Sequence, residues 1–97
     1  MENYEFKTTF WNDFSIADKF GKKAIQETYD RAFNEWKGDY IYLTELVLVL
    51  NWKIWEHYEK NDKEYAQLYD TLWKETDLYA TDNLKGAELD YFIKTTD

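Results

Sequence analysis

YIYLTELVLVLNWKIWEHYEKN, residues 40–61, sets the architecture of the chain. With successive residues placed about 100° apart, as in an α-helix, apolar side chains occupy most of the circumference. One arc contains Leu43, Leu46, Val47, Leu50, Ile54 and Tyr58. A second arc contains Leu48, Trp52 and Trp55. Because a helix that is apolar on most sides must be covered on several sides, we expect residues 40–60 to form the central helix of a bundle.

Only a narrow strip of this helix looks suited to water. The strip contains Glu45, Val49, Lys53, Glu56 and Lys60. We therefore expect neighbouring helices to cover both apolar arcs, so that the leucines and tryptophans hold the core together. Recognition of any partner would then be left to the periphery of the molecule.

Two further helices are predicted, one on each side of the central helix in the sequence. Residues 22–37 carry apolar side chains at spacings of three and four, and residues 63–85 show a second stripe with the same period. Gly38 suits the end of the first of these helices, Asp39 can cap the central one, and Asp62 can cap the helix over residues 63–85. Because so short a connection joins residues 22–37 to the central helix, the two should be antiparallel neighbours.

The two ends of the chain leave alternatives open. Ser15 and Asp18 have the spacing of a capping box, which favours a short helix near 15–20. Residues 4–9 alternate apolar and polar side chains as a strand does, and residues 91–96 could pair with them. A short helix is the preferred structure for the C-terminal segment. The predicted fold class is all-α, a small bundle of three main helices plus these two end segments.

Length and composition limit the classes of function. Residues 1–97 are enough for a single helical domain. The net charge of −8, with most of the acidic excess in residues 64–97, repels phosphate backbones and anionic lipids. We therefore expect neither direct nucleic-acid binding nor membrane binding. The absence of cysteine, of a signal-peptide pattern and of a long apolar run favours a cytoplasmic location.

No catalytic or metal-binding motif is recognisable. His57 is the only histidine and there is no cysteine, so a zinc site would need one imidazole and several carboxylates. The paired Glu-x-x-His motifs of di-iron bundles are also absent. We expect no enzymatic activity, no cofactor and no metal. The alternative is a small-ligand protein or enzyme with a pocket around Trp52, Trp55, Glu56 and His57.

The aromatic content is the feature that points to a function. Phe, Trp and Tyr make up 21% of the chain, and a domain this small buries only about 60% of its unfolded surface, so some rings must lie outside. Tyr and Trp at partly wet positions are common interface anchors. We therefore predict a non-enzymatic, acidic protein-binding domain, with a basic protein as the favoured partner and a structural homodimer as the alternative. The predicted partner-binding residues are Asp70, Glu75, Asp77, Asp82, Trp11, Tyr42 and Tyr91.

Three stretches carry a resemblance to a known group of proteins. They are FWNDFSIADKFG (residues 10–21), LTELVLVLNWKIWEHYEKN (43–61) and LKGAELDYFIKTTD (84–97). With them the chain resembles short uncharacterised acidic proteins encoded on conjugative or phage-like mobile elements of gut bacteria. The resemblance covers nearly the whole length but contains only hydrophobic-pattern motifs. It implies an accessory protein, for example one whose acids stand in for phosphates and block a basic surface of a host defence or nucleic-acid-processing protein.

Overall fold

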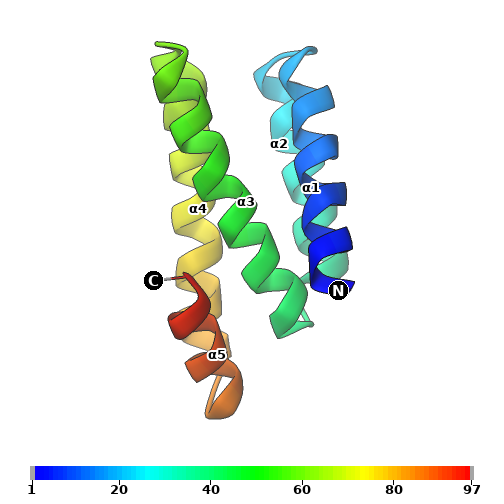
Figure 1. Ribbon diagram of the computed structural model, residues 1–97, viewed down its shortest axis with the longest axis vertical. Helices are drawn as coiled ribbons and strands as arrows, with labels where there is room; N and C mark the ends of the chain where they lie inside the picture. Colours follow the sequence, from blue (N-terminus) through cyan, green and yellow to red (C-terminus); the bar gives the residue numbers. More distant parts are fainter. Residues whose placement is uncertain (1, 97) are drawn as a thin grey trace.

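The chain folds as an all-helical bundle, as its hydrophobic pattern predicts. A computed structural model describes residues 2–96, and their side chains from Phe10 onward. Over these residues there are five helices and no strand (Figure 1). The helices are α1 (Glu2–Asp18), α2 (Lys22–Trp36), α3 (Tyr40–Glu59), α4 (Lys63–Asn83) and α5 (Ala87–Thr96). None of the described helices is long and apolar enough to cross a membrane.

α2, α3 and α4 begin and end within two residues of their predicted positions, and nearby aspartates cap the starts of α3 and α4. The Asp39 carboxylate accepts a hydrogen bond from the Ile41 amide at 3.0 Å and caps α3. Asp62 accepts from the Tyr65 amide at 3.3 Å and caps α4 in the same way. Each cap satisfies an amide that has no acceptor within the first helical turn.

The predictions for the two chain ends are wrong in part. The strand alternative fails because residues 4–9 lie in α1 and residues 91–96 lie in α5. The short helix near 15–20 is instead the last turn of the 17-residue helix α1, so Ser15 does not open a helix. Local alternation could not reveal this, because α1 is held by a stripe that faces the core. That stripe contains Phe10, Phe14 and Ala17, all of them buried.

α3 lies between two groups of helices (Figure 1). α1 and α2 pack on one side of it, and α4 and α5 lie on the other. Two groups of buried side chains fill the bundle. The larger joins α1, α2, α3 and α4 and includes Phe14, Ile25, Leu46, Leu50, Tyr69 and Leu72. The smaller closes the end near α5 and contains Leu43, Val47, Ala80, Leu84 and Phe92.

The arc of Leu43, Leu46, Val47, Leu50 and Ile54 is buried as predicted, but the environments predicted for the other faces of α3 are wrong. In the strip expected to face water, Glu45, Val49 and Lys53 are only 2%, 0% and 1% exposed. Residues expected in the core lie outside instead, namely Trp52 (46% exposed), Trp55 (61%) and Tyr58 (50%). The reason is that α1 packs against the strip, where Ser15 and Asp18 bind the Lys53 ammonium and Trp11 covers it, while Trp52 and Trp55 stay exposed in spite of their ring contacts. A periodic pattern shows which residues share a face, but not which face receives a neighbour.

Candidate functional site

The acids predicted to bind a partner are divided between two flanks of α4. Glu75 and Asp82 are exposed on one flank, and Asp70 and Asp77 are half-buried on the other. Asp70 forms an ion pair with Lys74 at 2.9 Å, which neutralises part of the second flank. These acids therefore give α4 a diffuse negative charge rather than one compact acidic surface.

The predicted aromatic anchors also lie in two places. The Tyr42 ring packs edge-on against Trp36, with ring centroids 4.5 Å apart, and Tyr91 packs edge-on against Tyr40 at 5.3 Å. Both contacts are at the N-terminal end of α3, and both tyrosines are half-buried. Their rings are engaged in packing at that end of the bundle.

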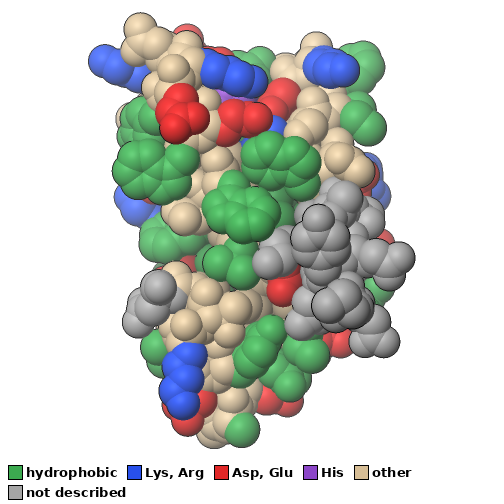
Figure 2. Space-filling view, in the orientation of Figure 1, with side chains coloured by type: hydrophobic (Ala, Val, Ile, Leu, Met, Phe, Trp, Pro, Cys, Tyr) green, Lys and Arg blue, Asp and Glu red, His purple; other side chains and the backbone are tan. Residues whose placement is uncertain are grey.

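Trp11, the third predicted anchor, belongs to a different group of rings. It packs edge-on against Trp52 at 6.2 Å, and Trp55 lies beside Tyr58 with centroids 6.0 Å apart. We call Trp11, Trp52, Trp55 and Tyr58 the aromatic face. Figure 2 shows hydrophobic side chains gathered over α3, directly beside acidic ones. Three of the four rings come from the second half of α3 at spacings of three, which places them in one slanting row.

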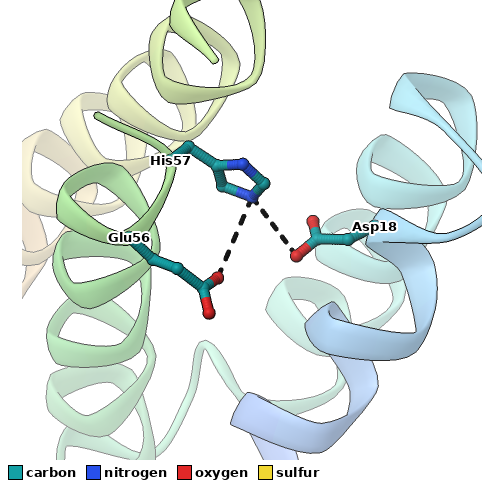
Figure 3. A group of neighbouring side chains, drawn as sticks. All are labelled: Asp18, Glu56 and His57. Atoms are coloured by element: carbon teal, nitrogen blue, oxygen red, sulfur yellow. Dashed lines mark ion pairs between the residues drawn. The ribbon is translucent and has the colours of Figure 1, made fainter. Parts of the chain in front are cut away.

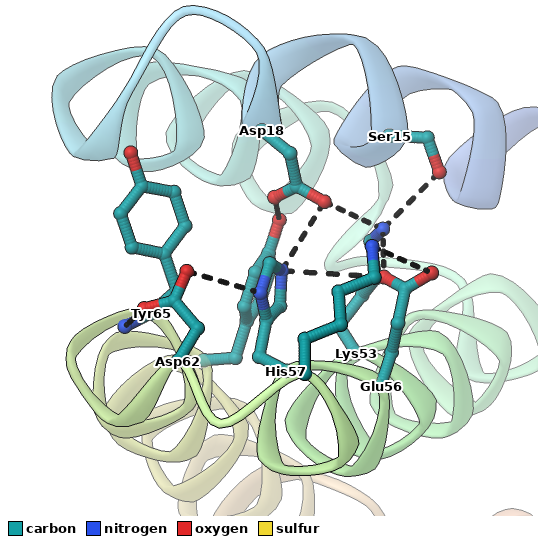
Figure 4. Close-up of polar contacts among 9 residues, drawn as sticks. Ser15, Asp18, Lys53, Glu56, His57, Asp62 and Tyr65 are labelled. Carbon is teal, nitrogen blue, oxygen red and sulfur yellow. Dashed lines mark hydrogen bonds and ion pairs between the residues drawn. The ribbon is translucent and has the colours of Figure 1, made fainter.

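Next to the aromatic face, a lysine is buried in a polar cluster between α1 and α3. The Lys53 ammonium donates to Asp18 Oδ2 at 2.7 Å, to Glu56 Oε1 at 2.7 Å and to Ser15 Oγ at 3.1 Å (Figure 4). Its nitrogen also lies 4.4 Å from the centroid of the Trp11 ring. All three of its N–H donors are thereby used, so the buried charge is paired and hydrogen-bonded.

Asp18 connects this lysine to two buried rings. Its Oδ1 accepts a 2.6 Å hydrogen bond from the Tyr69 hydroxyl, while its Oδ2 faces Lys53 and His57. Burial, followed by the bond to Asp18, raises the pKa of Tyr69 well above its ordinary value. The imidazole of His57 is stacked on Tyr69, with centroids 5.4 Å apart and the planes 16° from parallel. Tyr69 therefore supports both the carboxylate and the imidazole.

His57 is 4% exposed and surrounded by carboxylates. Its Nε2 lies 3.2 Å from Asp18 Oδ2 and 4.0 Å from Glu56 Oε1 (Figure 3). Its Nδ1 lies 3.7 Å from Asp62 Oδ2. Although these distances are short, neither ring nitrogen makes a hydrogen bond of acceptable geometry with any described residue. The imidazole is thus a buried polar group whose two nitrogens are left without a hydrogen bond by the described residues.

The cluster opens to solvent through a pocket of about 490 Å³. The pocket lies where the ends of α1 and α3 meet the start of α4 (Figure 4). Its lining residues are Ser15, Asp18, Lys19, Lys53, Glu56, His57, Lys60, Asp62 and Tyr65. The sequence suggested a pocket around Trp52, Trp55, Glu56 and His57. In the structure Glu56 and His57 line the pocket described here, whereas Trp52 and Trp55 do not.

Sequence reasoning missed Asp18, Lys53 and Asp62 as members of this cluster. Because Lys53 is charged, the sequence pattern predicts that it faces water. Asp18 and Asp62 are predicted only as capping residues. The available signal is a single lysine and a single histidine in a mostly apolar helix, and it points to no particular partner. A comparison of the chain with protein-family models, with curated proteins and with solved structures finds no match, so its function is argued from geometry alone.

Proposed function

We propose that this protein is a non-enzymatic binding domain that docks a basic, amphipathic segment of a protein partner on its aromatic face. The observation that carries the proposal is the exposure of Trp52, Trp55 and Tyr58 in one row beside acidic residues. Large aromatic side chains are the commonest energetic anchors of protein interfaces. In this proposal, recognition lies on α3 rather than on the acids of α4.

The size of the face suits the centre of an interface. Three rings that are about half exposed leave roughly 300 Å² open to solvent, given that an aromatic side chain can bury about 150–250 Å². Exposed apolar patches of this extent on single domains are often functional. A standard interface needs about 800 Å² from each partner, so polar residues around the rings must supply the rest.

Charge favours a basic partner over a second copy of the chain. Two copies would each carry a net charge of −8 and repel one another as they approach, whereas a basic segment is attracted. Glu59 is exposed on α3, one turn after Trp55, and can pair with a lysine or arginine of the partner. The contact between the Lys53 ammonium and the Trp11 ring shows that this ring system accommodates a cation.

The acids of α4 have a supporting role in this proposal. Asp70, Glu75, Asp77 and Asp82 extend the negative field around the molecule, which speeds the encounter with a basic partner without requiring contact. A basic surface that normally holds nucleic acid is a target of this kind. The mobile-element setting, with a host defence or nucleic-acid-processing protein as the target, is the narrower version of the proposal.

The test is affinity capture from the native cell, followed by binding measurements with the purified partner. Trp55→Ala should abolish capture of the partner, because it removes the most exposed ring of the aromatic face. Leu78→Ala is the matched control, since Leu78 is equally exposed but lies on α4. Affinity for the purified partner should weaken as salt rises from low to physiological concentration.

Two results would overturn the proposal. One is a partner that binds Trp55→Ala and the wild type equally, which would move the interface away from the aromatic face. The other is an affinity that does not change with salt concentration, because it would show that the partner is not recognised through basic residues. Competition by nucleic acid for the partner would sharpen the narrower version.

A further inference from the structure

We propose that Asp18, Glu56 and His57 form a binding site for a divalent transition-metal ion, with Zn²⁺ as the first candidate. One atom from each side chain, Asp18 Oδ2, Glu56 Oε1 and His57 Nε2, lies within 4.8 Å of both of the others (Figure 3). The site is separate from the aromatic face and stands whether or not that face binds a partner.

One of the ligand–ligand distances is already that of a zinc site, and a second is within 1 Å of it. Zinc binds nitrogen and oxygen ligands at about 2.0–2.2 Å, and tetrahedral geometry then places neighbouring ligand atoms about 3.4 Å apart. His57 Nε2 and Asp18 Oδ2 are 3.2 Å apart, which already matches this edge. Glu56 Oε1 lies 4.0 Å from Nε2, and its carboxylate is partly exposed, so a small rotation of that side chain completes the set.

The imidazole of His57 provides the second, independent observation. It is almost completely buried, yet neither of its nitrogens is hydrogen-bonded to a described residue. A buried polar atom without a partner is costly and is rare in folded proteins. Figure 3 shows Nε2 aimed between the two carboxylates, where a metal ion would receive its lone pair. Metal binding accounts for a nitrogen that the described residues leave without a hydrogen bond.

The two proposed carboxylate ligands already have outer partners that hold them, and a third carboxylate lies near the imidazole. The Tyr69 hydroxyl binds Asp18 Oδ1 and leaves Oδ2 turned toward the site. The Lys53 ammonium bonds the same two oxygens, Asp18 Oδ2 and Glu56 Oε1, at 2.7 Å each and so holds the two carboxylates beside each other (Figure 4). Asp62 lies 3.7 Å from His57 Nδ1, the position from which a carboxylate usually orients a metal-binding histidine. Such outer partners characterise built metal sites.

The charges leave room for a dication in addition to Lys53. With His57 neutral, the three carboxylates of Asp18, Glu56 and Asp62 exceed the single buried ammonium by two charges. Lys19 and Lys60 stand at the exposed rim of the pocket, where water screens them. Because a carboxylate oxygen has two lone pairs, Asp18 Oδ2 and Glu56 Oε1 can each bind the ammonium and an ion together.

The ligand set also defines the class of metal. An imidazole nitrogen favours transition metals over Mg²⁺ and Ca²⁺, which prefer oxygen alone. Three protein ligands leave at least one coordination position for water, and the pocket gives solvent access to it. The sequence does not reveal the set, because Asp18 comes from α1 and the other two ligands are adjacent on α3.

The test is calorimetric titration of the full chain with Zn²⁺, with Mg²⁺ as the selectivity control. We expect one ion per chain, and an increase of at least about tenfold in the dissociation constant for Glu56→Gln and for His57→Gln. Glu59→Gln removes the same charge from the same helix but lies outside the cluster, so it should change the constant by less than about twofold. Equal binding by Glu56→Gln and Glu59→Gln would overturn the proposal.

A second measurement needs no variant and so does not depend on whether His57→Gln folds. His57 is the only histidine, so its ring gives one set of nitrogen and proton resonances. One equivalent of Zn²⁺ should shift the Nε2 resonance much more than the Nδ1 resonance. If the His57 resonances stay in place, the cluster is an ion-pair network alone and the proposal fails.

Discussion

Lys53 and Trp55 lie two residues apart on α3, yet they occupy environments opposite to those that hydropathy assigns. The lysine is 1% exposed and the tryptophan 61% exposed. Lys53 tolerates burial because Ser15, Asp18 and Glu56 satisfy its three N–H groups. Trp55 stays exposed in spite of its ring contact with Tyr58. The comparison teaches that burial depends on available partners as much as on the residue itself.

The largest effect should come from removing the buried ammonium. Lys53→Met leaves the half-buried carboxylates of Asp18 and Glu56 without their closest counter-charge and should lower the free energy of unfolding by about 3–5 kcal/mol. Lys60→Met, on the same helix but exposed, should change it by less than about 0.5 kcal/mol. Urea denaturation of both variants measures the difference.

A combined variant sharpens the same comparison. Adding Asp18→Asn and Glu56→Gln to Lys53→Met removes the stranded charges and should recover most of the lost stability. If Lys53→Met alone is as stable as Lys60→Met, then the buried pairing does not hold α1 against α3 and the explanation given for the orientation of α3 is wrong.

An intermediate loss of folding stability should appear at high pH. Burial raises the pKa of Tyr69 and of Tyr29 above the ordinary value of 10.0. Above pH 10 the unfolded chain therefore releases protons that the folded chain retains, so stability falls as pH rises, by about 1.4 kcal/mol per pH unit for each such tyrosine. Urea unfolding between pH 9 and 11 should show a shallower decline for Tyr69→Phe than for the wild type.

Tyr58→Phe serves as the control for this pH dependence, because Tyr58 is half exposed on the aromatic face. Its slope should match that of the wild type. A Tyr69→Phe variant with an unchanged slope would show that the hydroxyl bonded to Asp18 ionises normally in the folded protein.

The smallest effect on stability is expected on the open side of α3. Trp55→Ala should lower the free energy of unfolding by less than about 1 kcal/mol, because most of its ring is already in water. Leu50→Ala, at a fully buried position on the same helix, should cost about 2–5 kcal/mol. Thermal unfolding of the pair checks this, and similar losses for both would mean that the aromatic face is packed in solution.

The sequence reveals part of the candidate metal site but not the aromatic face. Glu56 and His57 could be grouped from the sequence because they are adjacent on one helix. Asp18 could not be added, because its approach depends on how α1 crosses α3. The aromatic face on α3 could not be predicted either, because Trp52 and Trp55 are as suitable for a core as for an interface.

The sequence by itself determined the helical class, the three main helices and the caps at Asp39 and Asp62. Each of these follows from hydrophobic period or from hydrogen bonds between residues a few positions apart. Only the tertiary structure decided which side of α3 faces the core, and with it the burial of Lys53 and His57. That choice rests on contacts between distant segments, where a paired charge can replace an apolar side chain and a tryptophan can be left in water.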